Sequence, residues 1–176
     1  DLLLRAFGQL GGRFPEWRLR IVGPVAVSEG GGGEAFLAHL RGLAQGQRVE
    51  FRGPVFDSEA LAAVYRSGDL FCYPSIAESG EAFGVAALES MAAGVAPVVS
   101  NLSCFRDFVR DGENGWVFDH RGPAAEEALA GVLARAMLDE PLRRRAAEVA
   151  LRQISRFDFA AVAGCYLGEF ERILGA

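Results

Sequence analysis

Hydrophobic residues follow two alternating patterns along the chain. Apolar residues that recur every three to four positions predict helices that bury one face, and they alternate with short runs rich in β-branched and aromatic residues. Those runs predict strands at 18–22, 48–52, 69–73, 96–100 and 116–118,. Strands that alternate with helical crossovers are typical of a parallel sheet. The pattern therefore predicts a doubly wound α/β fold, a parallel sheet flanked by helices, with residues 1–176 as a single domain.

Turn and capping residues mark the ends of the predicted helices. A helix covers 2–12, a second follows Gly33, and Asp57 or Ser58 caps a third,. The later predicted helices cover 83–93, two segments that begin near Pro123 and Pro141, and 159–174,. The last one is expected to pack loosely.

Residues 82–105 form an apolar stretch that is long enough to span a bilayer and contains one charged side chain, Glu89,. Gly94, Pro97 and Asn101 interrupt this stretch,. We therefore interpret it as a buried helix, a turn and a buried strand, and not as a membrane span. A carboxylate in a helix that is apolar on all sides needs a partner or a ligand, so Glu89 is a candidate functional residue.

Composition excludes several functional classes. The net charge of −5 and the scattered basic residues argue against a nucleic-acid partner,. The arginine run at 143–145 is typical of a solvated helix face, and His39 and His120 are expected at the surface. No cluster of Asp, Glu, His or Cys has metal-ligand spacing, so we expect neither a metal nor another cofactor.

The three cysteines are distant from one another and lie in apolar surroundings. Cys72, Cys104 and Cys165 are therefore expected to be reduced core thiols, which suits a cytoplasmic protein,. The chain starts at Asp1 without an initiator methionine, so we expect it to be a piece of a longer protein. That longer protein could be peripheral at the inner face of the membrane.

The most informative segment places carboxylates on both sides of a helix start. Glu81 precedes the predicted helix and Glu89 lies within it. Between them, the unpaired amides at 83–86 (Phe83, Gly84, Val85 and Ala86) favour an anion such as a diphosphate, and Gly84 would let a ligand approach the backbone. The alternative is structural: Glu89 could hold a neighbouring loop by accepting backbone hydrogen bonds.

Six segments in register resemble the C-terminal domain of family 4 (group 1) retaining glycosyltransferases, over nearly the whole chain. They are RLRIVG at 18–23, RVEFRG at 48–53, DLFCYPS at 69–75, EAFG at 81–84, LESMAAG at 88–94 and RDGENG at 110–115. The resemblance implies a Rossmann-like domain that forms one half of a two-domain GT-B fold. It also implies that an N-terminal domain belongs to the same protein.

The resemblance also implies roles for individual residues. Glu81 and Glu89 match the two glutamates of the family's E-x7-E motif, in which the first contacts the donor sugar and the second the nucleotide ribose. The amides at 83–86 would hold the diphosphate, and Gly23 and Pro24 would border the base. Three features within the chain depart from the family: Ala82 replaces a common glycine, the approach at 77–80 is longer, and the turn at 101–105 lacks the common paired glycines. The family's Arg and Lys for the diphosphate would lie upstream of Asp1.

The expected function is retaining, metal-independent transfer of a hexose from a nucleotide-diphospho-sugar to a glycan or lipid-linked acceptor. This chain alone is expected to be inactive, because its cleft would be completed by the N-terminal domain. The alternatives are a nucleotide-sugar epimerase or a sugar phosphorylase of the same fold, and a non-catalytic module that binds a nucleotide sugar.

Overall fold

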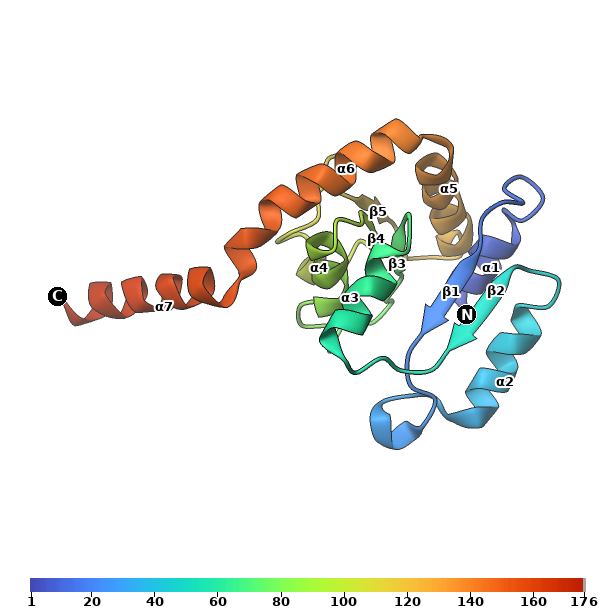
Figure 1. The fold of residues 1–176 in the computed structure, drawn as a ribbon, viewed down its shortest axis with the longest axis horizontal. Helices are drawn as coiled ribbons and strands as arrows, with labels where there is room; N and C mark the ends of the chain where they lie inside the picture. The colour runs from blue at the N-terminus through green and yellow to red at the C-terminus, as the bar shows by residue number, and fades with distance from the viewer. Residues whose placement is uncertain (176) are drawn as a thin grey trace.

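Five short parallel strands form the centre of the protein (Figure 1). The computed structural model describes residues 1–175. Strands β1 (Leu19–Val22) and β2 (Val49–Arg52) form one sheet. Strands β3 (Phe71–Tyr73), β4 (Pro97–Ser100) and β5 (Trp116–Phe118) form a second sheet in that order. The predicted α/β class, with parallel sheets flanked by helices, is confirmed.

Helices occupy the predicted crossovers between the strands. They are α1 (Leu2–Gly8), α2 (Gly33–Leu43), α3 (Ser58–Arg66), α4 (Val85–Ala92), α5 (Ala125–Leu138), α6 (Glu140–Gln153) and α7 (Phe159–Leu174). The predicted cap of α3 is Asp57, whose side chain accepts a hydrogen bond from the Ala60 amide at 2.8 Å,. Helix α1 ends earlier than predicted, because residues 9–13 form turns.

Strand β4 separates two hydrophobic clusters. All four of its residues are buried, and successive side chains point to opposite faces of the sheet,. Val98 therefore packs with α1 and α5, in a cluster that includes Phe7 and Leu129. Val99 packs on the other side, in a cluster that includes Met91 and Phe105. Burial on both faces explains why three of the four residues are apolar, Ser100 at the carboxyl end being the exception,.

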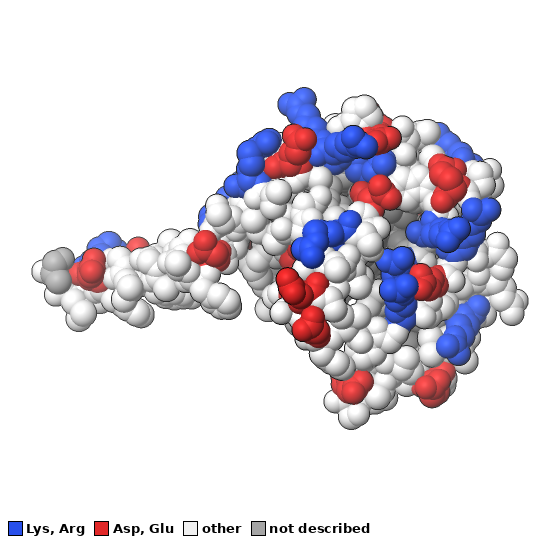
Figure 2. Space-filling model, in the orientation of Figure 1, with Lys and Arg blue, Asp and Glu red and all other residues white. Residues whose placement is uncertain are grey.

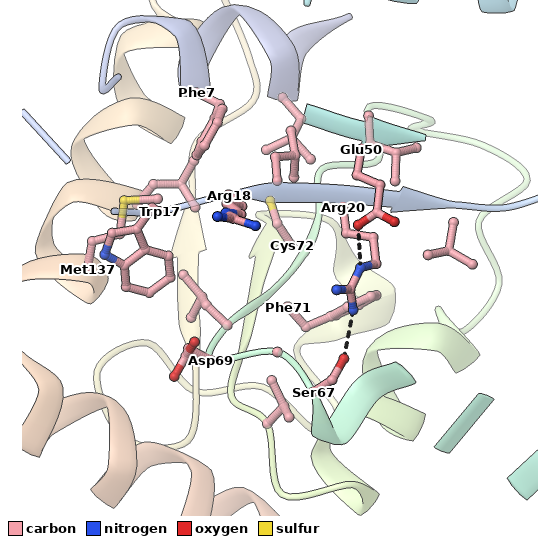
Figure 3. Close-up of a pocket in the computed structure, with 18 of the residues that line it drawn as sticks. Phe7, Trp17, Arg18, Arg20, Glu50, Ser67, Asp69, Phe71, Cys72 and Met137 are labelled. Atoms are coloured by element: carbon pink, nitrogen blue, oxygen red, sulfur yellow. Dashed lines mark hydrogen bonds and ion pairs between the residues drawn. The ribbon is translucent and has the colours of Figure 1, made fainter. Parts of the chain in front are cut away.

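The two sheets meet at a seam where β1 and β3 are not paired. The pattern predicted one continuous sheet layer, and the structure differs here: a cavity of about 1290 Å³ lies along the seam. Backbone hydrogen bonds do not join β1 to β3 at this seam, and the side chain of Arg20 extends along it instead. Its guanidinium donates to Glu50 at 3.1 Å and to Ser67 at 2.7 Å (Figure 3). Arg20 thus connects β1 with the end of α3.

The arginine run at 143–145 is only partly a solvated face. Arg143 is buried, and the prediction was wrong for this residue. Its guanidinium donates to the carbonyls of Ala136 and Met137, at 2.8 and 3.3 Å, and lies 4.9 Å from the Trp17 ring centroid. These carbonyls are in the last turn of α5, where carbonyl groups have no amide partner within the helix. A buried arginine therefore satisfies the end of a neighbouring helix.

Helix α7 projects away from the rest of the molecule (Figure 1). Its packing partner is the short 3₁₀ helix η3 (Ile154–Phe157), so the expected loose packing is confirmed. Few charges cover it in Figure 2, and Cys165 is exposed on it, contrary to the expected core position. Its exposed large apolar residues are Phe159, Val162, Tyr166, Leu167, Phe170, Ile173 and Leu174. Within residues 1–175, no helix has both the length and the hydropathy of a membrane span.

Candidate functional site

The candidate site is built on the connection from β3 to α4. Strand β3 ends at Tyr73, a loop follows, and α4 begins at Val85 after Gly84. Gly84 adopts a left-handed conformation with φ of 66°, and a Cβ there would collide with the ring of Phe105. The sequence predicted that this glycine makes room for a ligand. In the structure, both its backbone conformation and its packing against Phe105 require glycine.

The N-terminus of α4 offers free amides. Hydrogen bonding within the helix starts late, because the amides of Ala87 and Leu88 both donate to the carbonyl of Gly84. The amides of Val85 and Ala86 precede them, and no side chain caps this end,. Val85 is 57% exposed, so solvent reaches the first turn. Uncapped helix starts of this kind can bind anions, and the contact of these amides with a diphosphate stays a prediction. Phe83, by contrast, turns its ring toward Phe108, with 5.3 Å between the ring centroids.

Each of the two candidate glutamates accepts a hydrogen bond from a tyrosine. The Tyr73 hydroxyl donates to Glu81 at 3.1 Å, and the Tyr65 hydroxyl donates to Glu89 at 3.0 Å. Phe71 lies between the two tyrosines, at centroid distances of 5.4 and 6.4 Å. Burial, followed by the bond to the glutamate, raises the pKa of both tyrosines,. The phenols therefore stay protonated and orient the carboxylates.

The two tyrosines were missed by the sequence analysis. A signal existed: Tyr65 and Tyr73 are two of only three tyrosines in the chain, and each lies at the end of an element that leads toward the site. Their pairing with particular glutamates depends on how α3 packs against α4 and on where the loop places Glu81. Local sequence patterns do not contain this information about tertiary packing.

Glu89 has the partner that was expected but not the predicted burial. Helix α4 buries Ala87, Ser90 and Met91 on one face, whereas Glu89 is on the exposed face. The prediction of a helix buried on most sides was wrong, because apolar composition alone does not show which face meets solvent. An exposed carboxylate beside a free helix N-terminus remains accessible to a ligand.

The cavities contact only some of the predicted residues. The large cavity along the seam reaches from Val22, at the end of β1, to Ala86 in the first turn of α4. Glu89 lines a smaller cavity of about 210 Å³ between α3 and α4. Gly23 and Pro24 follow β1, where the Gly23 amide donates to the Arg52 carbonyl at 3.3 Å. Glu81 precedes α4 and Glu89 lies within it, each with its own tyrosine partner, whereas the Gly23-Pro24 turn lies at the end of the smaller sheet. Their joint contact with one donor stays a prediction.

A charged cluster lies beside this site and was not predicted. Glu78, in the loop after β3, contacts both His120 and Arg121 beyond β5. His120 was expected at the surface, but its side chain is only 3% exposed, so that prediction was wrong. The local sequence did not show that Glu78, from a distant loop, contacts His120. Within residues 1–175, no group of three His, Cys, Asp or Glu residues is arranged to hold a metal ion.

Comparison with known proteins adds to this geometry. Phosphatidyl-myo-inositol mannosyltransferase of Mycobacterium tuberculosis is 33% identical over 177 residues, which cover 99% of this chain and 44% of that protein. The chain thus spans less than half the length of this relative.

Solved structures show the same fold. The structure of Anabaena HepE with UDP and glucose superposes with a TM-score of 0.78 at 22% identity, over 97% of this chain and 44% of that one. The C-terminal domain of LpcC from Francisella tularensis, a glycosyl transferase group 1 family protein, superposes with a TM-score of 0.71 at 22% identity, over 88% of this chain and 76% of that one. Such neighbours are GT-B glycosyltransferases, in agreement with the predicted fold class. The family model for glycosyl transferases group 1 matches residues 1–153, and the chain belongs to that family.

Proposed function

We propose that this chain binds the donor of a retaining hexosyltransferase, a nucleotide-diphospho-sugar, and that the whole protein transfers the hexose to a glycan or lipid-linked acceptor without a metal ion. One observation carries the proposal. Glu81 and Glu89 flank the uncapped N-terminus of α4, and a tyrosine orients each of them. The site thus combines an anion-binding helix end with two hydroxyl-binding carboxylates.

In this mechanism the α4 amides bind the diphosphate. The positive end of the helix dipole stabilises the negative charge that grows on the diphosphate as the sugar departs. Glu89 accepts the ribose hydroxyls, and Glu81 accepts hydroxyls of the sugar and so holds its anomeric carbon toward the acceptor. Carboxylates suit both tasks because they accept hydrogen bonds from pairs of hydroxyl groups.

Relatives and neighbours support the donor class. HepE has been solved with UDP and glucose, and also with UDP-glucose. The mycobacterial relative is named a mannosyltransferase. A hexose is common to these names, and the HepE structures add a uridine diphosphate. The acceptor would be bound mainly by the part of the protein that this chain does not contain, so we expect no transfer by the chain alone.

Calorimetric titration with UDP-, GDP- and ADP-linked hexoses, and with the matching nucleoside diphosphates, tests the proposal. Glu89→Gln should weaken binding of both ligand types, because a hydrogen bond to a charged group contributes about 1.5–3 kcal/mol, which is roughly one to two orders of magnitude in affinity. Glu81→Gln should weaken binding of the nucleotide sugar and leave the bare diphosphate nearly unchanged.

Glu148→Gln is the matched control. Glu148 is an exposed glutamate on α6 that pairs with Arg152, and its replacement should change neither affinity. If Glu89→Gln leaves affinity unchanged but lowers the melting temperature, Glu89 is a structural anchor of α3 through Tyr65 and the site assignment is wrong.

A further inference from the structure

Glu78 connects the loop before α4 to the segment after β5. Its Oε1 lies 2.8 Å from His120 Nε2 and 2.8 Å from Arg121 Nε. Its Oε2 accepts a further hydrogen bond from the Arg121 guanidinium at 3.1 Å. Both carboxylate oxygens of one loop residue are therefore bound by two consecutive residues of a distant segment.

The same cluster extends to the end of β4. Arg121 also donates to the carbonyl of Asn101 at 3.1 Å, and the Asn101 amide donates to the Phe118 carbonyl at 2.9 Å. Asn101 follows β4 and Phe118 ends β5. The loop is thus attached to the carboxyl ends of two neighbouring core strands, the edge of the sheet at which β3 also ends.

His120 is a costly residue for a purely structural contact. Its side chain is 3% exposed, and its Nδ1 is buried without a hydrogen-bond partner in residues 1–175. Because the Glu78 carboxylate can only accept, Nε2 is the donor of this hydrogen bond, and Nδ1 is the ring nitrogen that has no partner,. An apolar side chain would fill this position without that cost. The hydrogen bond from His120, together with Arg121, lowers the pKa of the Glu78 carboxyl and keeps it charged.

We propose that His120 and Arg121 are positioning residues for the donor sugar: they hold Glu78, and through it the loop at 74–82, so that Glu81 meets the sugar. This inference rests on the proposed function. Glu81 lies three residues after Glu78 in the same loop, and its side-chain contact to the body of the protein is the bond from Tyr73. Glu78 lies in the 77–80 segment that leads to Glu81 and α4.

The expected effect follows from population arithmetic. Apparent affinity falls in proportion to the fraction of molecules in which the binding conformation is formed. If loss of the His120 bond leaves the loop in place in about one molecule in ten, the sugar-dependent part of the affinity falls about tenfold. The bare diphosphate is bound by Glu89 and the α4 amides, which the cluster does not contact.

The test compares two replacements of His120. His120→Leu removes the donor and keeps an apolar side chain, whereas His120→Gln restores an N–H near the position of Nε2. His39→Leu, at an exposed histidine on α2, is the control. Two quantities are measured on each chain: hydrogen exchange of the amides at 74–82 without ligand, and the affinity ratios of UDP-glucose to UDP and of GDP-mannose to GDP.

We expect His120→Leu to accelerate exchange in the loop and to lower the affinity ratio about tenfold, His120→Gln to restore both, and His39→Leu to change neither. Unchanged exchange at 74–82 in His120→Leu overturns the proposal, as does an equal loss of affinity for the sugar nucleotide and the bare diphosphate. If the wild-type chain binds none of the ligands, the proposed function is wrong, and the exchange comparison alone then decides whether His120 anchors the loop.

Discussion

The three cysteines of the chain lie in three different environments. Cys72, on β3, contacts the cavity between the sheets, and burial raises the pKa of its thiol to about 12 (Figure 3). Cys104 is buried beside Phe105, and burial also raises its pKa. Cys165 is exposed on α7. Because the thiolate is the reactive form, these environments predict different reactivities.

Thiol labelling of the native chain at pH 8 should therefore modify one cysteine quickly, Cys165. A thiol with a pKa near 12 is ionised in roughly one molecule in ten thousand at this pH, so Cys72 should react slowly. The measurement is mass spectrometry of the modified peptides against time. In denaturant all three cysteines should react, and Cys165→Ser should remove the fast phase. A fast phase that persists in Cys165→Ser would contradict the assigned burial of the other two.

Residue by residue, the sequence identified the groups that bear the chemistry but not their neighbours. Glu81, Glu89 and the helix start between them follow from spacing and resemblance, and in the structure each glutamate accepts a hydrogen bond from its own tyrosine. Tyr65 and His120 come from other elements, so local patterns could not assign their partners. The burial of Arg143 depends on where α5 ends, which is again tertiary information.

At the scale of elements, hydrophobic periodicity predicted every strand within about two residues, and capping predicted the start of α3. These local patterns failed where contacts with other elements determine the start or end of a helix. Helix α4 begins two residues later than predicted, because Gly84 turns to the left-handed conformation beneath Phe105. The missing pairing between β1 and β3 was also not predictable, because the hydrophobic runs that predict strands do not show which strands pair with each other.

Substitution of this glycine tests what fixes the start of α4. Gly84→Ala should destabilise the chain by about 2–4 kcal/mol, because a side chain disfavours the positive φ and collides with Phe105,. Urea unfolding followed by circular dichroism measures the change in the free energy of unfolding.

Gly131→Ala is the matched control. Gly131 lies within α5, where nothing stands within 4 Å of an added Cβ and φ is not positive. Its replacement should stabilise the chain by about 0.5–1 kcal/mol through helix propensity. If Gly84→Ala costs less than about 1 kcal/mol, the Phe105 ring does not hold the helix start as described.

At the scale of the whole molecule, the core and α7 are separate. Both hydrophobic clusters are formed by residues that precede α7, and the family match ends at residue 153. The apolar residues of α7 recur every three to four positions and form one face, while Glu171 and Arg172 lie on the other,. Within residues 1–175, η3 is the one element with which α7 makes more than a weak contact.

The apolar face of the projecting helix α7 favours self-association of the isolated chain. Burial of this face against another surface removes it from water, and at high concentration a second copy of the chain provides that surface. We expect the chain to associate reversibly as its concentration rises, and a chain that ends at residue 158 to remain monomeric. Sedimentation equilibrium over a hundredfold range of concentration measures this.

The shortened chain should keep its free energy of unfolding within about 1 kcal/mol, because it loses no residue of either cluster,. If the shortened chain still associates, the surface responsible lies outside α7. If the shortened chain is much less stable, α7 packs against the rest of the protein in solution. If neither occurs, the helix governs how the chain behaves in a crowded solution while contributing little to its folding.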